Sequence, residues 1–257
     1  MASRIVDAVR PRAGDALVEI GPGLGALTVP LLERAGALQA VEIDRDLAAR
    51  LRARALPGLV VHEADALEIP LERLLETAPV GDPAGADRPA RLRLVGNLPY
   101  NVGTALLMRF AERLALVEDV HAMLQKEVVE RLHAAPASPA RGRLSVVMQA
   151  AFRVAPLFEV APGAFRPAPK VRSAVVRLVA RPDAPDRAGL EALSHAARLA
   201  FANRRKTLRN NFRGALDAAA LEALGVDPGA RAETLEPGAF ARLGAALAAT
   251  GRVPPDG

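Results

Sequence analysis

The sequence predicts an α/β fold: a mostly parallel seven-stranded sheet with an antiparallel edge hairpin, followed by a small all-helical C-terminal domain. Three observations predict it. Short apolar runs alternate with helical patterns through the first half of the chain. Two further apolar runs follow each other closely before residue 181, and everything beyond residue 187 has helical periodicity. Repeated strand–helix–strand units favour parallel strands joined by right-handed crossovers.

The elements follow from apolar runs of strand length and from helical spacing between them. The predicted strands cover residues 16–20, 38–43, 59–62, 92–96, 119–124, 151–160 and 173–180. The predicted helices of the first domain cover residues 26–35, 45–55, 71–77 and 104–114. The last two strands are close in sequence, so we expect them to form an antiparallel pair at the sheet edge.

Proline- and glycine-rich stretches mark the loops, at residues 79–90, 134–142 and 181–187. The last of them, with Pro182 and Pro185, follows the final strand and predicts a boundary between domains 1–180 and 181–257. The helices expected beyond it cover residues 190–201, 206–216, 219–224 and 237–249.

The composition excludes several classes of site. The 257 residues contain no cysteine, so a disulfide framework, a thiolate metal site and a cysteine nucleophile are excluded. The four histidines have no metal-ligand spacing, and we predict no metal. The charged first residues and the lack of a long apolar run indicate neither a signal peptide nor a membrane span, so we expect a cytoplasmic protein.

A glycine-rich turn follows the first predicted strand in Glu19-Ile20-Gly21-Pro22-Gly23-Leu24-Gly25. Glycines there permit a tight turn and let a ligand approach the backbone. The spacing Gly-x-Gly-x-Gly differs from the Gly-x-Gly-x-x-Gly typical of dinucleotide sites. Glu19, two residues ahead of the turn, suits a cationic ligand terminus better than a diphosphate. We therefore assign Glu19, Gly21, Gly23 and Gly25 to a cofactor site.

Acidic residues at the next two strand ends extend this site. Glu42 ends the second strand, where a carboxylate can accept hydrogen bonds from both ribose hydroxyls. Asp65 follows the third strand and either accepts from an adenine amino group or caps a helix. With their neighbours Ile43 and Ala66, they predict a cofactor that contains adenosine.

The segment Gly96-Asn97-Leu98-Pro99-Tyr100-Asn101 follows the fourth strand. A plain turn is the simple interpretation. The chemical one is methylation of an exocyclic adenine amine, whose lone pair is delocalised into the ring. The Asn97 side chain and the Leu98 or Pro99 carbonyl could accept from its two N–H groups, while Tyr100 stacks on the base. In-line positioning would then supply most of the rate.

These segments together closely resemble the ribosomal RNA adenine N6-dimethyltransferases. The resemblance rests on residues 18–28, 41–44, 96–101, 125–128, 142–146 and 165–173. It implies a Rossmann-like class I methyltransferase fold and S-adenosyl-L-methionine as cofactor, held at Gly21, Glu42, Asp65 and Asn97. It also implies that Phe165 helps Tyr100 to hold the target base, although the residues alone favour loop packing for Phe165.

A basic segment supplies the expected RNA contacts. No acidic residue lies between Glu191 and Asp217, a window that holds six cations. Phosphate binding is the interpretation that we favour over a solvated charged face, and affinity should fall steeply with salt. On the predicted helix 206–216, Lys206, Arg209 and Arg213 would form one polar stripe. The predicted RNA-binding residues are Lys170, Arg172, Arg204, Arg205, Lys206, Arg209 and Arg213.

Within the family, the chain looks most like the members that dimethylate two adjacent adenosines near the 3′ end of 16S ribosomal RNA. The expected partner is 16S rRNA in the immature small ribosomal subunit, bound by a monomer without a membrane. The alternatives are a large-subunit rRNA methyltransferase of the resistance type, a ribosome-assembly factor with secondary or lost methylation, and a dinucleotide oxidoreductase. The family's usual Gly-Gln-x-Phe-Leu segment is absent from this sequence, so we expect weak cofactor affinity until that segment is restored.

Overall fold

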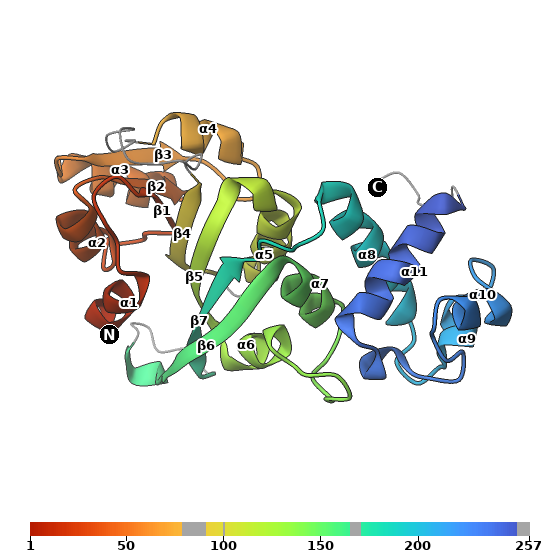
Figure 1. Cartoon of the computed structure of the whole chain (residues 1–257). Helices are drawn as coiled ribbons and strands as arrows, with labels where there is room; N and C mark the ends of the chain where they lie inside the picture. The colour runs from red at the N-terminus through yellow and green to blue at the C-terminus, as the bar shows by residue number, and fades with distance from the viewer. Residues whose placement is uncertain (79–90, 100, 165–170, 251–257) are drawn as a thin grey trace. The chain divides into compact units, whose positions relative to one another are not determined.

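The computed structural model describes residues 1–78, 91–99, 101–164 and 171–250 (Figure 1). The predicted loop 79–90 and the predicted site residues Tyr100, Phe165 and Lys170 lie outside these ranges. The chain divides into two compact units. Unit 1 comprises the described residues of Met1–Val129 and Ala155–Ala180, and unit 2 those of Glu130–Val154 and Arg181–Gly257.

A seven-stranded sheet in the order β3-β2-β1-β4-β5-β7-β6 confirms the predicted fold class. The strands β1 to β5 pair in parallel, and β7 runs antiparallel to β5. The edge strand β6 contains Pro156, which cannot donate a backbone hydrogen bond and is tolerated at a sheet edge. The strands are β1 Ala16–Ile20, β2 Leu38–Glu42, β3 Leu59–Glu63, β4 Leu92–Asn97, β5 Val117–Gln125, β6 Phe152–Val160 and β7 Ser173–Ala180.

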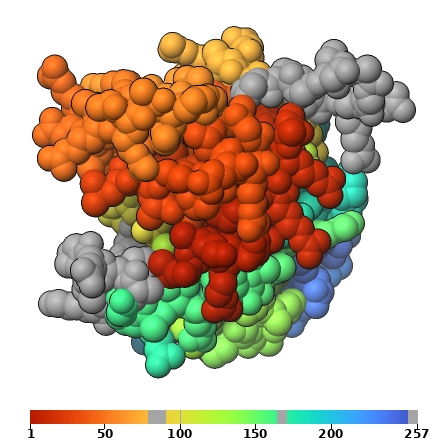
Figure 2. Space-filling model, turned by 90° about the vertical axis from the view of Figure 1, so that its left-hand side faces the viewer, coloured from red at the N-terminus to blue at the C-terminus, as the bar shows by residue number. Residues whose placement is uncertain are grey.

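Helices lie before and between the parallel strands. They are α1 Ala2–Val9, α2 Thr28–Ala35, α3 Arg45–Ala53, α4 Leu71–Glu76 and α5 Gly103–Glu112, followed by the short turn η2 Leu114–Leu116. Asp44 starts α3 because its carboxylate accepts from the backbone N–H groups of Asp46 and Leu47. Figure 2 shows the residues from α1 to β3, red to orange, as one continuous face of this unit. Among the described helices, none is long and apolar enough to cross a membrane.

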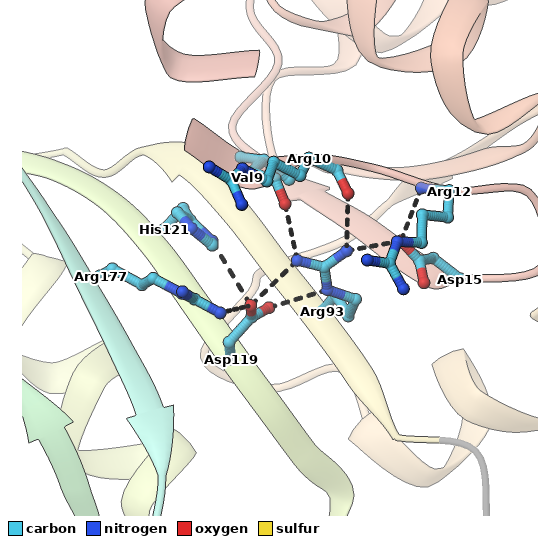
Figure 3. Close-up of polar contacts among 8 residues, drawn as sticks. All are labelled: Val9, Arg10, Arg12, Asp15, Arg93, Asp119, His121 and Arg177. Atoms are coloured by element: carbon cyan, nitrogen blue, oxygen red, sulfur yellow. Dashed lines mark hydrogen bonds and ion pairs between the residues drawn. The ribbon is translucent and has the colours of Figure 1, made fainter. Parts of the chain in front are cut away.

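A buried ionic cluster fixes the C-terminal end of α1 to the sheet (Figure 3). The Arg93 guanidinium on β4 donates to the Val9 carbonyl at 2.7 Å and contacts the Asp119 carboxylate on β5 at 3.0 Å. It also reaches Asp15 at 2.5 Å. Burial lowers the pKa of Arg93, but the hydrogen bonds and charges of Asp119 and Asp15 outweigh burial and raise it overall. The ion pairs of the cluster thus offset the free-energy penalty of burying each of these charges without a partner.

Two more side chains complete the surroundings of Asp119. Arg177 on β7 lies 3.4 Å from its carboxylate, and His121 on β5 lies 3.9 Å from it. Burial lowers the pKa of His121 to about 4, so the ring is neutral near pH 7. At the other end of α1, the Arg4 guanidinium stacks over the Phe158 ring at 4.1 Å. Cation stacking and the Arg93 cluster therefore hold both ends of α1.

Unit 2 consists of helices and turns together with the first three residues of β6. Helix α6 Lys126–Leu132 begins in unit 1 and ends in unit 2. The other helices of unit 2 are α7 Arg143–Ala151, α8 Arg187–Ala200, α9 Leu208–Asn211, α10 Ala218–Ala223 and α11 Pro237–Ala249, and η4 Ala232–Thr234 is a short turn in the same unit. The short turn η3 Pro162–Ala164 belongs to unit 1. Helices α8 and α11 pack side by side (Figure 1). The rings of Phe201 and Phe240 stack with centroids 5.9 Å apart.

The predicted helix 206–216 is wrong in length. Only Leu208–Asn211 is helical, and Gly214 takes a left-handed φ of 85° that ends the segment. The side chain of Asn211, the last residue of α9, donates to the Ala200 and Asn203 carbonyls. Lys206 and Arg213 lie outside α9, so the predicted polar stripe on one helix does not exist. The apolar side chains of this segment, Leu208 and Phe212, are both fully buried.

Residues 130–154 cluster with the C-terminal helices, although the loop at residues 181–187 was expected to separate them from those helices. Hydrogen bonds explain the difference. The buried Arg141 guanidinium donates to the Leu235 carbonyl at 3.2 Å, and the Ala137 N–H donates to the Glu233 carbonyl at 2.7 Å. These partners are remote in sequence, so no local pattern indicates them.

Gly244 on α11 gives the first testable prediction. A Cβ there would lie 2.7 Å from the Ala192 backbone carbon on α8, closer than real Cβ contacts. We expect Gly244→Ala to destabilise the protein by roughly 1–3 kcal/mol, because one helix must move. The matched control is Gly238→Ala on the same helix, whose Cβ would meet only the flexible Arg242 side chain at 3.7 Å. This control should be neutral or slightly stabilising. Equal urea midpoints for the two variants would contradict the prediction.

Candidate functional site

The carboxyl ends of three neighbouring strands bring the predicted site residues together. In the sheet register, Ile20 on β1 faces Val41 on β2 and Gly96 on β4. The next residues along these strands are Gly21, Glu42 and Asn97, which therefore meet at one edge of the sheet. A Cβ built on Gly21 would lie only 3.8 Å from the Asn97 carbonyl oxygen. The glycine turn and the Asn97 segment are thus direct neighbours.

The glycine turn needs glycine for its backbone. Gly21, Gly23 and Gly25 all have left-handed φ, at 67°, 56° and 84°. The Gly21 N–H donates to the Val41 carbonyl at 2.9 Å, which ties the turn to β2. Two large apolar side chains border this region and stay exposed, Leu24 at 75% and Ile43 at 68%. Such exposure beside a backbone turn is suited to an apolar ligand face.

Backbone donors orient Glu42. Its Oε2 accepts from the Gly23 N–H and its Oε1 from the Asp44 N–H, both at 3.0 Å. The side chain is 6% exposed, so it is held between the glycine turn and the start of α3. Each carboxylate oxygen has a further lone pair, because an ionised carboxylate offers about four acceptor sites. Glu42 can therefore accept from two ligand hydroxyls without giving up its backbone partners.

Glu19 is the most perturbed acid of the site. It is 1% exposed, and its Oε2 accepts from the Thr28 hydroxyl at 2.6 Å. Burial raises the pKa of Glu19 to about 7; the Thr28 hydrogen bond lowers it and the charge of Glu42 raises it. A ligand cation placed beside this carboxyl would lower its pKa and favour the ionised form. Thr28 was not expected here, because no spacing rule links it to Glu19.

We expect Glu19→Gln to stabilise the protein at pH 8. The pKa of Glu19 in the folded protein lies above its usual value. The protonated side chain therefore makes its full contribution to stability below about pH 4.5, and this contribution is lost as pH rises through 7. The glutamine does not ionise, so the difference in unfolding free energy should be near zero at pH 4.5 and reach at most about 3 kcal/mol at pH 8. Urea unfolding across this range measures it. A difference that did not change between pH 4.5 and pH 8 would contradict the assignment.

Asp65 begins a turn rather than a helix. Its Oδ1 accepts from the Leu67 N–H at 2.8 Å, and its carbonyl accepts from the N–H groups of Glu68 and Ile69. The alternative of a helix N-cap is therefore wrong, although the side chain does cap a turn. No hydrogen bond from a described residue engages Oδ2. Asp65 is half-buried, as is its neighbour Ala66.

The described part of the Asn97 segment contains both exposed and buried residues. Asn97 and Pro99 are exposed, and Leu98 is buried at 2%. The Pro99 carbonyl accepts from the N–H groups of Val102 at 3.2 Å and Gly103 at 2.8 Å, at the start of α5. No described residue donates to the Leu98 carbonyl. Of the two predicted carbonyl acceptors, Leu98 is therefore the available one, because Pro99 already serves the helix.

Most of the predicted RNA-binding residues that the structure describes are exposed. In unit 1, the Arg172 side chain is 69% exposed and pairs with Glu159 at 3.3 Å. In unit 2, Arg204 donates to the Pro139 and Arg141 carbonyls at 2.7 and 3.0 Å, so part of its guanidinium is used within the unit. The residues whose side chains form no hydrogen bond or ion pair with a described residue are Arg205, Lys206, Arg209 and Arg213. No group of three or more potential metal ligands occurs in the described ranges.

Comparisons with known proteins point to one family. A family model described as ribosomal RNA adenine dimethylase matches residues 1–248. The "Ribosomal RNA small subunit methyltransferase A" of Aromatoleum aromaticum is 52% identical over 90% of this chain and 83% of its own length. The protein of the same name from Acidithiobacillus ferrooxidans is 49% identical over 98% of this chain and 91% of its own.

Two solved structures share the fold over nearly the whole chain. A dimethyladenosine transferase from Plasmodium falciparum has a TM-score of 0.77 at 22% identity, covering 97% of this chain and 96% of its own. The 23S rRNA methyltransferase ErmE has a TM-score of 0.67 at 26% identity, with 96% of both chains covered.

Proposed function

Because the chain belongs to the ribosomal RNA adenine dimethylase family, we propose that it dimethylates two adjacent adenosines near the 3′ end of 16S rRNA. The methyl groups would come from S-adenosyl-L-methionine, and the substrate would be the immature small ribosomal subunit. The chain would act as a monomer in the cytoplasm. One observation carries the proposal: the exposed Asn97 lies beside the glycine turn, with its carbonyl oxygen 3.8 Å from the position of a Cβ built on Gly21.

The residues present fit S-adenosyl-L-methionine. The oriented Glu42 carboxylate suits ribose hydroxyls, and the exposed Ile43 beside it suits the face of an adenine. Asp65 Oδ2 suits the adenine amino group, while buried Glu19 and the glycine turn suit the cationic end. The cofactor supplies an electrophilic methyl group whose sulfonium charge is lost on transfer. No metal ligand is required of the chain for such a transfer.

At the target base, hydrogen-bond acceptors of this chain would orient the adenine amine for methyl transfer. Asn97 Oδ1 and the Leu98 carbonyl would each accept one N–H of the adenine amine. Two bonds of this kind favour a pyramidal nitrogen and direct its lone pair toward the glycine turn. Stacking by Tyr100 and Phe165 stays a prediction. The segment then accelerates the reaction mainly by orienting the amine, which requires no strong base.

RNA recognition rests on the exposed cations. Arg205, Lys206, Arg209 and Arg213 lie in a stretch without acids, which suits a phosphate backbone. Together with Arg172 they are the proposed phosphate contacts. Arg204 is a further proposed contact, through the N–H groups that its hydrogen bonds within unit 2 do not use. The target adenosine must leave its stack to reach Asn97, so the RNA would be recognised by shape and backbone with a base extruded.

Similarity favours the small subunit over the large one. The relatives named for the small subunit reach 52% and 49% identity, whereas the 23S rRNA methyltransferase has 26%. A substrate on the small subunit is therefore the better supported of the two.

The decisive test is methyl transfer to ribosomal particles. Purified protein and methyl-labelled S-adenosyl-L-methionine are incubated with immature small subunits, mature small subunits and large subunits. We expect dimethyladenosine at two adjacent sites near the 3′ end of 16S rRNA, in the immature particles only. Label in 23S rRNA would favour the large-subunit alternative. Tight RNA binding without any label would favour an assembly factor.

A further inference from the structure

Arg109 on α5 holds the loop that carries Asp65. Its Nη1 donates to the Ala66 carbonyl and its Nη2 donates to the Ile69 carbonyl. Arg109 forms no ion pair with a carboxylate in the described part of the chain. The guanidinium is half-buried and serves backbone oxygens instead. A planar guanidinium with parallel donors can bridge two carbonyls, whereas a lysine ammonium on a flexible stem holds them less rigidly.

The loop has few other constraints on these two carbonyls. Inside it, Asp65 receives the N–H groups of Leu67, Glu68 and Ile69. At its start, the Ala64 N–H donates to the Glu42 carbonyl at 3.0 Å. These bonds close the turn on itself and fix its first residue to β2. Among the described residues, Arg109 bonds the carbonyls of residues 66 and 69, and it thereby links the turn to α5.

The helix that carries Arg109 begins at the other half of the site. The Pro99 carbonyl accepts from Val102 and Gly103 at the first turn of α5. Arg109 lies six residues after Gly103, less than two helical turns along α5. One rigid element therefore contacts the segment of Asn97 at its start and the Asp65 loop through Arg109.

We infer that Arg109 is a positioning residue that sets Asp65 and Ala66 for the adenine of the cofactor. The inference rests on the proposed function, and it assigns no contact between Arg109 and the cofactor. Arg109 was not among the residues expected from the sequence. A lone arginine on an amphipathic helix carries no signal for two carbonyls about 40 residues earlier.

The test measures binding of two probes by Arg109→Ala. S-adenosylhomocysteine carries adenosine and the amino-acid end, and 5′-methylthioadenosine carries adenosine alone. If Arg109 positions the adenine side, both dissociation constants should rise by the same factor, about tenfold for one lost loop-ordering contact pair. The KM for S-adenosyl-L-methionine should rise similarly, while kcat at saturating cofactor changes less than about twofold. Hydrogen exchange at the amides of Leu67, Glu68 and Ile69 should become faster.

Controls separate positioning from folding. Arg113→Ala removes a cation at the end of the same helix, where Arg113 meets exposed Glu72 at 3.6 Å, and should leave both dissociation constants unchanged. Arg109→Lys keeps one donor and should give an intermediate affinity; it also decides the question if the alanine variant does not fold. Unchanged affinity for both probes, or weaker binding of S-adenosylhomocysteine alone, would overturn the inference. A wild-type chain that bound neither probe and transferred no methyl group to RNA would instead overturn the proposed function, and the assignment of Arg109 with it.

Discussion

Asn97→Ala is expected to lose methyl transfer while keeping RNA affinity. The substitution removes one of the two acceptors proposed for the adenine amine, and the exposed side chain supports no described neighbour. By analogy with the loss of one preorganised hydrogen-bonding group in an active site, kcat should fall roughly 10²–10³-fold. Single-turnover methyl transfer to immature small subunits measures the rate, and filter binding measures RNA affinity.

The control for this variant is Asn210→Ala, which removes an exposed amide from unit 2 at a single hydrogen bond to Thr207. It should retain wild-type turnover. Since Asn97 was also assigned to the cofactor site, affinity for S-adenosylhomocysteine should be measured in parallel. Full activity of Asn97→Ala would refute the proposed mechanism, and parallel loss of RNA binding would show that the residue supports the RNA site instead.

Arg93→Met should produce the largest loss of stability. Among the described residues, the substitution leaves Asp119, 1% exposed, with the half-exposed Arg177 as its one cationic partner, and it releases the backbone of Val9 at the end of α1. Removing one partner of a buried pair typically costs about 3–5 kcal/mol. Urea unfolding at pH 7 measures the loss. The double variant Arg93→Met/Asp119→Leu should recover much of it, because no buried charge then remains between these strands.

An exposed pair provides the comparison. Arg52 and Glu63 meet at 3.0 Å with side chains 44% and 38% exposed. Arg52→Ala should therefore cost less than about 1 kcal/mol. If Arg93→Met cost no more than Arg52→Ala, or if the double variant were less stable than the single one, the cluster would not hold α1 in place.

Local pattern was enough for most of the fold. The strand predicted at residues 16–20 and the helix predicted at 237–249 match β1 and α11, because uninterrupted apolar runs and helical spacing report burial directly. The helices α6 and α7 were not predicted; their short stretches follow a strand or precede one without a clear break. The predicted helix 206–216 is wrong in length because Gly214, with its left-handed φ, ends the segment.

The candidate site likewise combines residues that the local sequence predicts with contacts that it does not predict. Glycines, strand-end acids and the Asn97 segment are visible in sequence because each has a local reason for its residue type. The choice between the Leu98 and Pro99 carbonyls, the Thr28 bond to Glu19 and the Arg109 bonds all depend on partners brought together by folding. Rules of sequence spacing do not predict these contacts. The structure is therefore needed to say which neighbouring group can act.

The peptide between Leu98 and Pro99 has a consequence for base discrimination. Proline has no N–H, so this peptide offers an oxygen and no competing donor next to the Asn97 side chain. A base that carries a keto oxygen in place of the amine, as hypoxanthine and guanine do, would set that oxygen against the Leu98 carbonyl oxygen, which cannot donate. The proposed site would thus favour an amino group over a keto oxygen at this position of the base.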